Sequence, residues 1–90
     1  MTSREFLTFI VRELVSNPEA VKIEERQDER GTLLVVDVAL EDRGTIIGKG
    51  GVNANAIRQL LAIIGHKNSE SVGMSISSGR DYLFKSNSGN

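Results

Sequence analysis

Residues 44–51 have the sequence GTIIGKGG, and this glycine-rich run separates two stretches with helical apolar spacing. Before it, residues 41–47 can form a short helix. After it, apolar residues recur every three or four positions, which places them on one face of a second helix: Ala54, Ile57, Leu60, Leu61 and Ile64. Gly65 follows them and is a candidate C-terminal cap. Residues 48–51, the second half of the run, are therefore expected to be a tight turn between two consecutive helices.

Alternating apolar residues on either side of these helices predict three strands. The alternation that precedes the helices covers Val21, Ile23, Leu34, Val36, Val38 and Leu40. It is interrupted at residues 28–31, where Gly31 suits the left-handed position of a hairpin loop. Leu33 and Val35 fall on the opposite face, which we expect to face solvent. After the helices, a third strand has Val72, Met74 and Ile76 on one buried face.

The N-terminal segment predicts a helix over residues 3–16. Thr2 and Glu5 have the spacing of a capping box, in which each side chain satisfies a backbone amide of the helix start. An apolar stripe follows, in which both phenylalanines are expected to be core residues: Phe6, Leu7, Phe9, Ile10 and Leu14. Pro18 disfavours helix in the residue before it and ends the segment.

The predicted order of elements is helix, strand, strand, helix, helix, strand. This order indicates one α+β domain over residues 1–78, with a three-stranded sheet packed against three helices. Residues 79–90 are mostly polar, so we expect a flexible C-terminal tail that contains one apolar segment, Tyr82-Leu83-Phe84.

Charge is divided unevenly along a chain of 90 residues whose formal net charge is −1. Residues 1–42 carry five basic and ten acidic side chains, whereas residues 43–90 carry six basic and two acidic ones. The positive half contains the glycine run, so we expect a polarised molecule with its positive side there.

Composition excludes several classes of function. Cysteine is absent and His66 is the single histidine, so no thiol chemistry is available and no cluster of metal ligands is recognisable. We therefore expect no catalytic residue, no metal and no cofactor. No signal peptide or apolar run of the ~20 residues that span a bilayer is present, which favours the cytoplasm and no membrane partner.

The glycine run does not match the phosphate loops of nucleotide enzymes. A P-loop requires four residues between its first glycine and the Gly-Lys pair, whereas three separate Gly44 from Gly48, and Gly50 stands where Ser or Thr would bind magnesium. A dinucleotide fingerprint starting at Gly48 would require glycine at position 53, which is Asn53.

The remaining pattern is Gly48-x-x-Gly51 between two helices, preceded by Ile47 and followed by Ala54 and Ile57. It resembles the KH domain, whose GXXG loop clamps the backbone of about four nucleotides of a single strand. The predicted order of elements matches the type II arrangement of that fold. With the Asn17-Pro18 helix stop and the run at residues 56–61, the chain is similar, over residues 3–78, to small bacterial single-KH RNA-binding proteins.

The resemblance implies a site that binds single-stranded RNA, as an RNA chaperone or post-transcriptional regulator. Gly48, Gly50 and Gly51 let the phosphate approach the backbone, amides at the start of the following helix attract it, and Lys49 adds a charge. Arg58 is expected to reach a neighbouring phosphate. The bases would lie against an apolar wall, and the remaining candidates are Ile46, Ile47, Ile57, a strand residue such as Val36 or Val38, and Asn53.

Two departures from the family pattern leave an alternative open. Val52 and Thr45 occupy positions where basic residues are common in such proteins. Weak binding would then require a second copy or a second KH protein, through effective concentration. The alternative is a KH-fold adaptor that associates with proteins and has weak or lost RNA binding. A nucleotide enzyme, the third hypothesis, has no catalytic cluster to support it.

Overall fold

The computed structural model describes residues 1–77, in which the predicted order of helix, strand, strand, helix, helix, strand is confirmed. The helices are α1 (Ser3–Leu14), α2 (Arg43–Ile47) and α3 (Val52–Lys67), and the strands are β1 (Lys22–Asp28), β2 (Gly31–Asp37) and β3 (Val72–Ser77). The predicted tail, residues 79–90 with Tyr82-Leu83-Phe84, lies outside the described residues.

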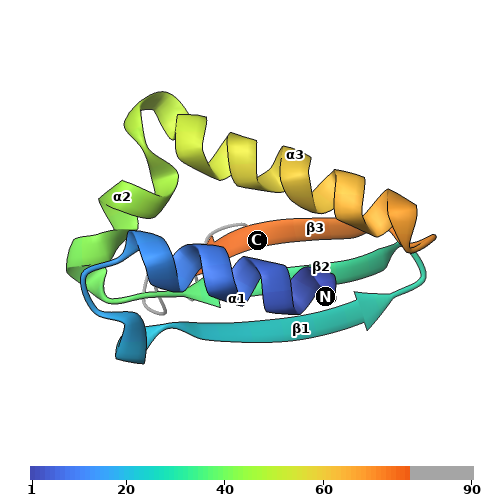
Figure 1. Ribbon diagram of the computed structural model, residues 1–90, viewed down its shortest axis with the longest axis horizontal. Coiled ribbons are helices and arrows are strands. Elements are labelled where there is room, and N and C mark those ends of the chain that lie inside the picture. Colours follow the sequence, from blue (N-terminus) through green and yellow to red (C-terminus); the bar gives the residue numbers. More distant parts are fainter. Residues whose placement is uncertain (78–90) are drawn as a thin grey trace, which may run out of the picture.

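The three strands form one sheet in the order β1-β2-β3, with the helices over one of its faces (Figure 1). β1 and β2 are an antiparallel hairpin, whereas β2 and β3 are parallel. Parallel strands need a long crossover connection, and here that connection contains α2, the glycine run and α3. The fold therefore places the glycine run on the crossover between the central strand and the last one.

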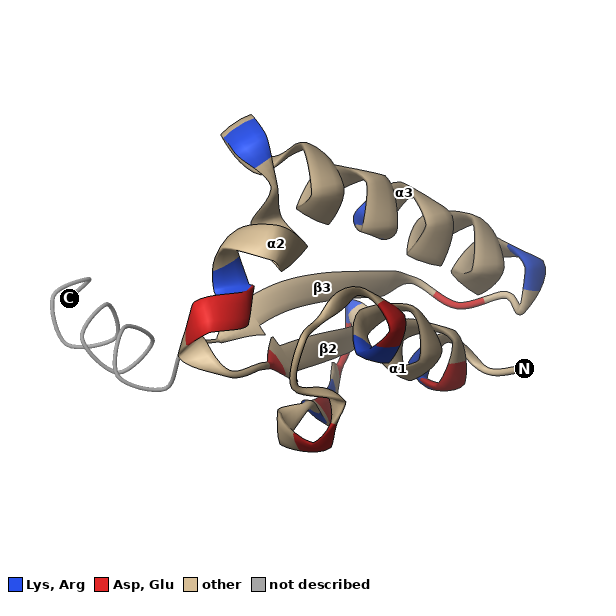
Figure 2. Ribbon diagram, turned by 60° about the vertical axis from the view of Figure 1, so that its left-hand side comes forward, with Lys and Arg blue, Asp and Glu red and all other residues tan. Residues whose placement is uncertain are grey.

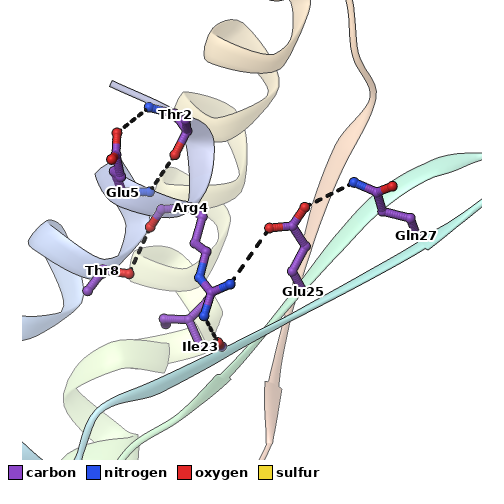
Figure 3. A network of polar contacts seen from close by, with 7 residues as sticks. All are labelled: Thr2, Arg4, Glu5, Thr8, Ile23, Glu25 and Gln27. Carbon is purple, nitrogen blue, oxygen red and sulfur yellow. Dashed lines mark hydrogen bonds and ion pairs between the residues drawn. The ribbon is translucent and has the colours of Figure 1, made fainter.

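Helix α1 begins with the predicted capping box. The Thr2 hydroxyl accepts a hydrogen bond from the Glu5 amide at 3.0 Å, and the Glu5 carboxylate accepts one from the Thr2 amide at 2.8 Å (Figure 3). Arg4 then connects this end of α1 to β1, because its Nη2 donates to the Ile23 carbonyl at 2.9 Å and its Nη1 lies 3.9 Å from the Glu25 carboxylate. The start of α1 is thus fixed on the edge strand.

The far end of α1 is held by a buried carboxylate. Asp42 is 2% exposed, and its two oxygens accept hydrogen bonds from the amides of Ser16 and Asn17 at 2.9 and 3.1 Å. These amides follow the last turn of α1, while Asp42 directly precedes α2. Asp42 therefore joins the end of one helix to the start of another.

One core lies between the sheet and the helices, and its members are Leu7, Val11, Val15, Ile23, Leu34, Val36, Val38, Ile46, Ala54, Ile57, Leu61 and Met74. Four residues that the sequence pattern assigned to buried stripes are instead exposed: Phe9 (56%), Leu14 (45%), Leu40 (63%) and Leu60 (44%). Phe9 and Leu60 lie on helix faces that point away from the sheet. Leu40 begins a 3-10 turn after β2 has ended at Asp37, so strand alternation no longer applies to it.

Two further expectations require correction. Leu33 is 38% exposed, as expected of the outer sheet face, but Val35 is only 6% exposed. Val35 is in the central strand, where Glu24 of β1 and Ser75 of β3 are its neighbours and cover it on either side. Gly65 is not a helix cap, because α3 continues to Lys67.

Gly65 is instead a point of close contact between α3 and the chain that enters β3. A Cβ atom at position 65 would lie 2.7 Å from the Glu70 carbonyl oxygen and 2.8 Å from Cγ2 of Val72. The absence of a side chain therefore allows the helix to approach the strand.

Candidate functional site

The four residues Gly48–Gly51 form an exposed bend between α2 and α3, here called the glycine bend (Figure 1). Gly48, Gly50 and Gly51 have φ values of 78°, 66° and 82°. Each value lies in the left-handed region, where a residue with a Cβ atom is disfavoured by roughly 1–2 kcal/mol. The bend therefore depends on glycine at three of its four positions.

Some amides of the glycine bend are bonded and others are not. Gly48 and Gly51 donate to the carbonyls of Gly44 and Gly48 at 2.8 and 3.1 Å, and Val52 donates to Lys49. Outside the regular helical bonds, the amides of Lys49 and Gly50 donate to no backbone carbonyl within residues 1–77. The free donors thus lie at the tip of the bend, while the amides of Gly51 and Val52, at the start of the following helix, are used internally.

Space at the tip also differs between the glycines. A Cβ atom at Gly50 would meet nothing within 4 Å, whereas one at Gly48 would lie 2.7 Å from Cγ of Asn53. Gly50 and Lys49 are exposed, so a ligand can reach the two free amides without displacing protein atoms.

The polar candidates on α3 are engaged within the protein. Asn53 donates from Nδ2 to the Thr45 carbonyl at 2.8 Å. Arg58 donates from Nε to the Met74 carbonyl of β3 at 3.1 Å and from Nη1 to the Asn55 side chain at 3.1 Å. Arg58 therefore lies between α3 and the edge strand β3, and its Nη2 group is not used by either of these two bonds.

The apolar candidates divide into one exposed residue and several buried ones. Ile47 is 38% exposed and directly precedes the glycine bend. Ile46 (0%) and Ile57 (5%) belong to the core, as do Val36 and Val38, which are 0% and 7% exposed. In this conformation these four side chains support the helices from beneath and present almost no surface to a ligand.

Charge around the glycine bend is positive. Residues 43–67 include Arg43, Lys49, Arg58 and Lys67 and contain no aspartate or glutamate. In Figure 2, α3 and the bend carry blue and tan segments, whereas red segments lie on α1, on the hairpin strands, on the turn before α2 and on the connection from α3 to β3. The segment that contains the bend is therefore positive, with Glu41 and Glu70 beyond its two ends.

An exposed apolar face of α3 was missed by the sequence analysis. Val52, Leu60 and Ile63 are 59%, 44% and 66% exposed. With the exposed Ala56 they recur at intervals of four, four and three residues, which is one face of a helix. The signal was the surplus of apolar residues in this helix, since a helix packed on one side needs only one apolar stripe.

The part of the chain that the structure describes contains neither a cluster of metal ligands nor a membrane-spanning helix. No three His, Asp or Glu side chains within residues 1–77 are grouped so that they could hold a metal ion. No helix in the same range has the length and apolar character needed to cross a membrane.

The KH-domain model of the KhpA/KhpB family matches residues 4–76. The chain belongs to this family. Its α+β architecture, with three helices on a three-stranded sheet, is the KH fold predicted from the order of elements.

Two relatives in this family match the chain over nearly their whole length. RNA-binding protein KhpA of Chlamydia pneumoniae is 40% identical over 73 residues, which are 81% of this chain and 94% of the relative. RNA-binding protein KhpA of Listeria monocytogenes serovar 1/2a is 36% identical over 72 residues, or 80% of this chain and 95% of the relative. The glycine bend lies inside the matched KH domain.

Proposed function

We propose that this KhpA/KhpB-family chain binds single-stranded RNA at the glycine bend. The observation that carries the proposal is the pair of free amides of Lys49 and Gly50 at an exposed tip. Backbone amides and a nearby ammonium group suit an anionic phosphate oxygen. The relatives named RNA-binding protein KhpA support RNA as the ligand.

In this proposal the sugar-phosphate backbone lies across Gly48–Gly51. The amides of Lys49 and Gly50 donate to one phosphate, and the Lys49 ammonium neutralises part of its charge. Ile47 offers an apolar contact to a sugar or base beside the bend. Arg58 contacts a second phosphate through Nη2 while Nε and Nη1 keep their bonds to Met74 and Asn55. Ile46 and Ile57 contribute from beneath, through the packing that holds both helices in place.

The proposed role is binding without catalysis, in the cytoplasm, as an RNA chaperone or a post-transcriptional regulator. A shallow, backbone-directed contact favours modest sequence preference, because phosphate contacts carry no base information. Such a protein can hold many RNA segments open without selecting one.

We further propose that the chain acts as a homodimer, with a second KH protein as the other possible partner. The apolar face of α3 (Val52, Ala56, Leu60 and Ile63) ends at the exposed Lys67, four residues after Ile63, while Arg58 is directed to β3. Two copies can bring the four apolar residues together with Lys67 at the edge of the contact. Pairing would join two glycine bends in one particle and raise affinity through effective concentration.

A second candidate function is a protein adaptor with little RNA affinity. Val52 after the bend and a net charge of −1 favour it, because fewer phosphate contacts are available than in a basic RNA-binding domain. The same α3 face would then be its binding surface.

The test is fluorescence anisotropy with a random single-stranded RNA at low salt. The double variant Lys49→Asp, Gly50→Asp should bind about 10- to 100-fold more weakly, the factor expected for lost charge-assisted hydrogen bonds of about 1.5–3 kcal/mol. The control is Lys67→Asp, Asn68→Asp, which makes the same change of charge at the other exposed end of α3. Circular dichroism checks that both variants fold.

Equal binding by the native chain and the bend variant would refute the glycine bend as the site. If none of the three proteins bound RNA, the adaptor would be favoured.

A further inference from the structure

Helix α2 is too short to hold its own conformation. It has five residues, Arg43–Ile47, and helices of this length are unstable without outside support. Its last carbonyls have no partner within the helix, as at every helix C-terminus. The carbonyl of Gly44 is satisfied by the amide of Gly48, at 2.8 Å. The next carbonyl, that of Thr45, needs a different donor.

That donor comes from the other side of the glycine bend. Asn53 is the second residue of α3, and its Nδ2 donates to the Thr45 carbonyl at 2.8 Å, across eight residues of chain. The bond connects the end of α2 directly to the start of α3. It therefore closes the glycine bend at its base.

Gly48 provides the room for this bond. A Cβ atom at position 48 would lie 2.7 Å from Cγ and 2.8 Å from Nδ2 of Asn53. Glycine is thus needed at position 48 for its positive φ and also for the space that the asparagine side chain fills. The first glycine of the motif and Asn53 form one structural unit.

We propose that Asn53 is a positioning residue that fixes the glycine bend in its RNA-receiving shape, an inference that rests on the proposed function. Three of the four residues of the bend are glycine, which gives the backbone of this segment more conformational freedom than that of any other four consecutive residues of the domain. Without the bond to Thr45, the tip amides sample more orientations and RNA must order them on binding. Fixing the base of the bend lowers the entropy that these amides lose when RNA binds.

This assignment differs from the role expected from the sequence, in which Asn53 contacts RNA. The bond from Nδ2 to Thr45 fixes the side chain, and in the present proposal the asparagine acts on RNA through Lys49 and Gly50. The two roles predict different behaviour of the chain before RNA is added.

The experiment compares the native chain with Asn53→Ala and Asn53→Asp by ¹H–¹⁵N NMR without RNA and by anisotropy with single-stranded RNA. Asp keeps the shape of Asn but, when ionised, cannot donate to Thr45. Both variants should broaden or multiply the amide signals of Gly48, Gly50 and Gly51 while the signals of β1–β3 stay in place. RNA affinity of Asn53→Ala should fall about three- to tenfold, the usual effect of one hydrogen bond.

Gln59→Ala is the matched control, since Gln59 is an exposed polar residue of the same helix. It should leave both the bend signals and RNA affinity unchanged. Asn53→Asp also adds charge near the phosphate, so its evidence is the NMR spectrum of the free chain alone.

Weaker RNA binding by Asn53→Ala with unchanged bend signals would overturn the proposal and make Asn53 a direct RNA contact. If Asn53→Ala changed neither the bend signals nor the RNA affinity, Asn53 would have no role in the site. If the native chain bound no RNA, the proposed function would fail, whereas broadened signals in the variants would still show that Asn53 orders the bend.

Discussion

Asp42 connects the end of α1 to the start of α2, since it is the side chain within residues 1–77 that accepts hydrogen bonds from the amides after α1. Its carboxylate is buried and accepts from the amides of Ser16 and Asn17. A buried amide that loses its acceptor costs about 1–3 kcal/mol, and more where the acceptor was charged. The turn after α1 therefore depends on this one residue.

Asp42→Ala should lower the free energy of unfolding by about 1–3 kcal/mol, because two partly buried amides lose a charged acceptor together. Urea denaturation measures the change. Glu41→Ala is the control, since Glu41 is exposed and accepts its hydrogen bond from the Asn17 side chain. A loss below about 1 kcal/mol for Asp42→Ala, similar to surface substitutions, would contradict this account.

Two glycines in neighbouring helices have opposite roles. Gly65 of α3 is buried, and an added Cβ there would lie 2.7 Å from the Glu70 carbonyl oxygen, whereas an added Cβ at Gly44 of α2 would meet nothing within 4 Å. Gly44 also lacks a positive φ. Helix propensity alone favours alanine over glycine by about 1 kcal/mol at both positions, so any difference between them measures packing.

Gly44→Ala should raise the free energy of unfolding by about 0.5–1 kcal/mol. Gly65→Ala should lower it by about 1–3 kcal/mol, because overpacking at the contact between α3 and β3 exceeds the gain in propensity. Thermal and urea unfolding of the two variants form a paired measurement. Stabilisation by both alanines would show that α3 and β3 can separate without cost.

The elements could be predicted from the sequence because each has a local signal. The Thr2–Glu5 capping box, the change of apolar period from helix to strand, and the glycine run all act within a few residues. Which side of each helix is buried depends on the partner element. Phe9 and Leu60 were therefore assigned to the core although both are exposed.

The candidate site was predictable in part for the same reason. The glycine run identifies a bend, and Lys49 lies within it, so both follow from adjacent residues. The bonds of Asn53 to Thr45 and of Arg58 to Met74 join residues eight and sixteen positions apart and depend on the packed arrangement. Burial of Ile46 and Ile57 likewise depends on how α2 and α3 meet the sheet.

Across the whole molecule, the uneven charge limits how strongly salt should affect RNA binding. Residues 43–67 carry four cationic side chains, of which Lys49 is in the bend and Arg58 is engaged with Met74 and Asn55. One or two phosphate contacts correspond to a slope of log K against log salt of about −0.7 to −1.4 for single strands.

A salt titration of RNA binding by anisotropy should give a slope in that range. The Lys49→Asp, Gly50→Asp variant should have a slope closer to zero, because the phosphate contact at the bend is lost. A slope steeper than about −3 for the native chain would indicate at least four phosphate contacts and a more extended surface.

Self-association is the second property of the whole molecule. Ile63→Glu places a charge in the apolar face of α3 and should shift the chain from dimer to monomer in size-exclusion chromatography with light scattering. The control is Ala62→Glu, which adds the same charge at the next exposed position, about 100° around the helix. If the native chain elutes as a monomer at high micromolar concentration, the dimer proposal is wrong.

The parallel pairing of β2 with β3 has a consequence for synthesis. The sheet gains its third strand only after residues 72–77 have been made, although the glycine bend is complete more than twenty residues earlier. Until β3 emerges from the ribosome, Arg58 lacks the Met74 carbonyl and α3 lacks the strand against which Gly65 packs. Binding at the glycine bend should therefore reach full strength only once β3 has paired with β2.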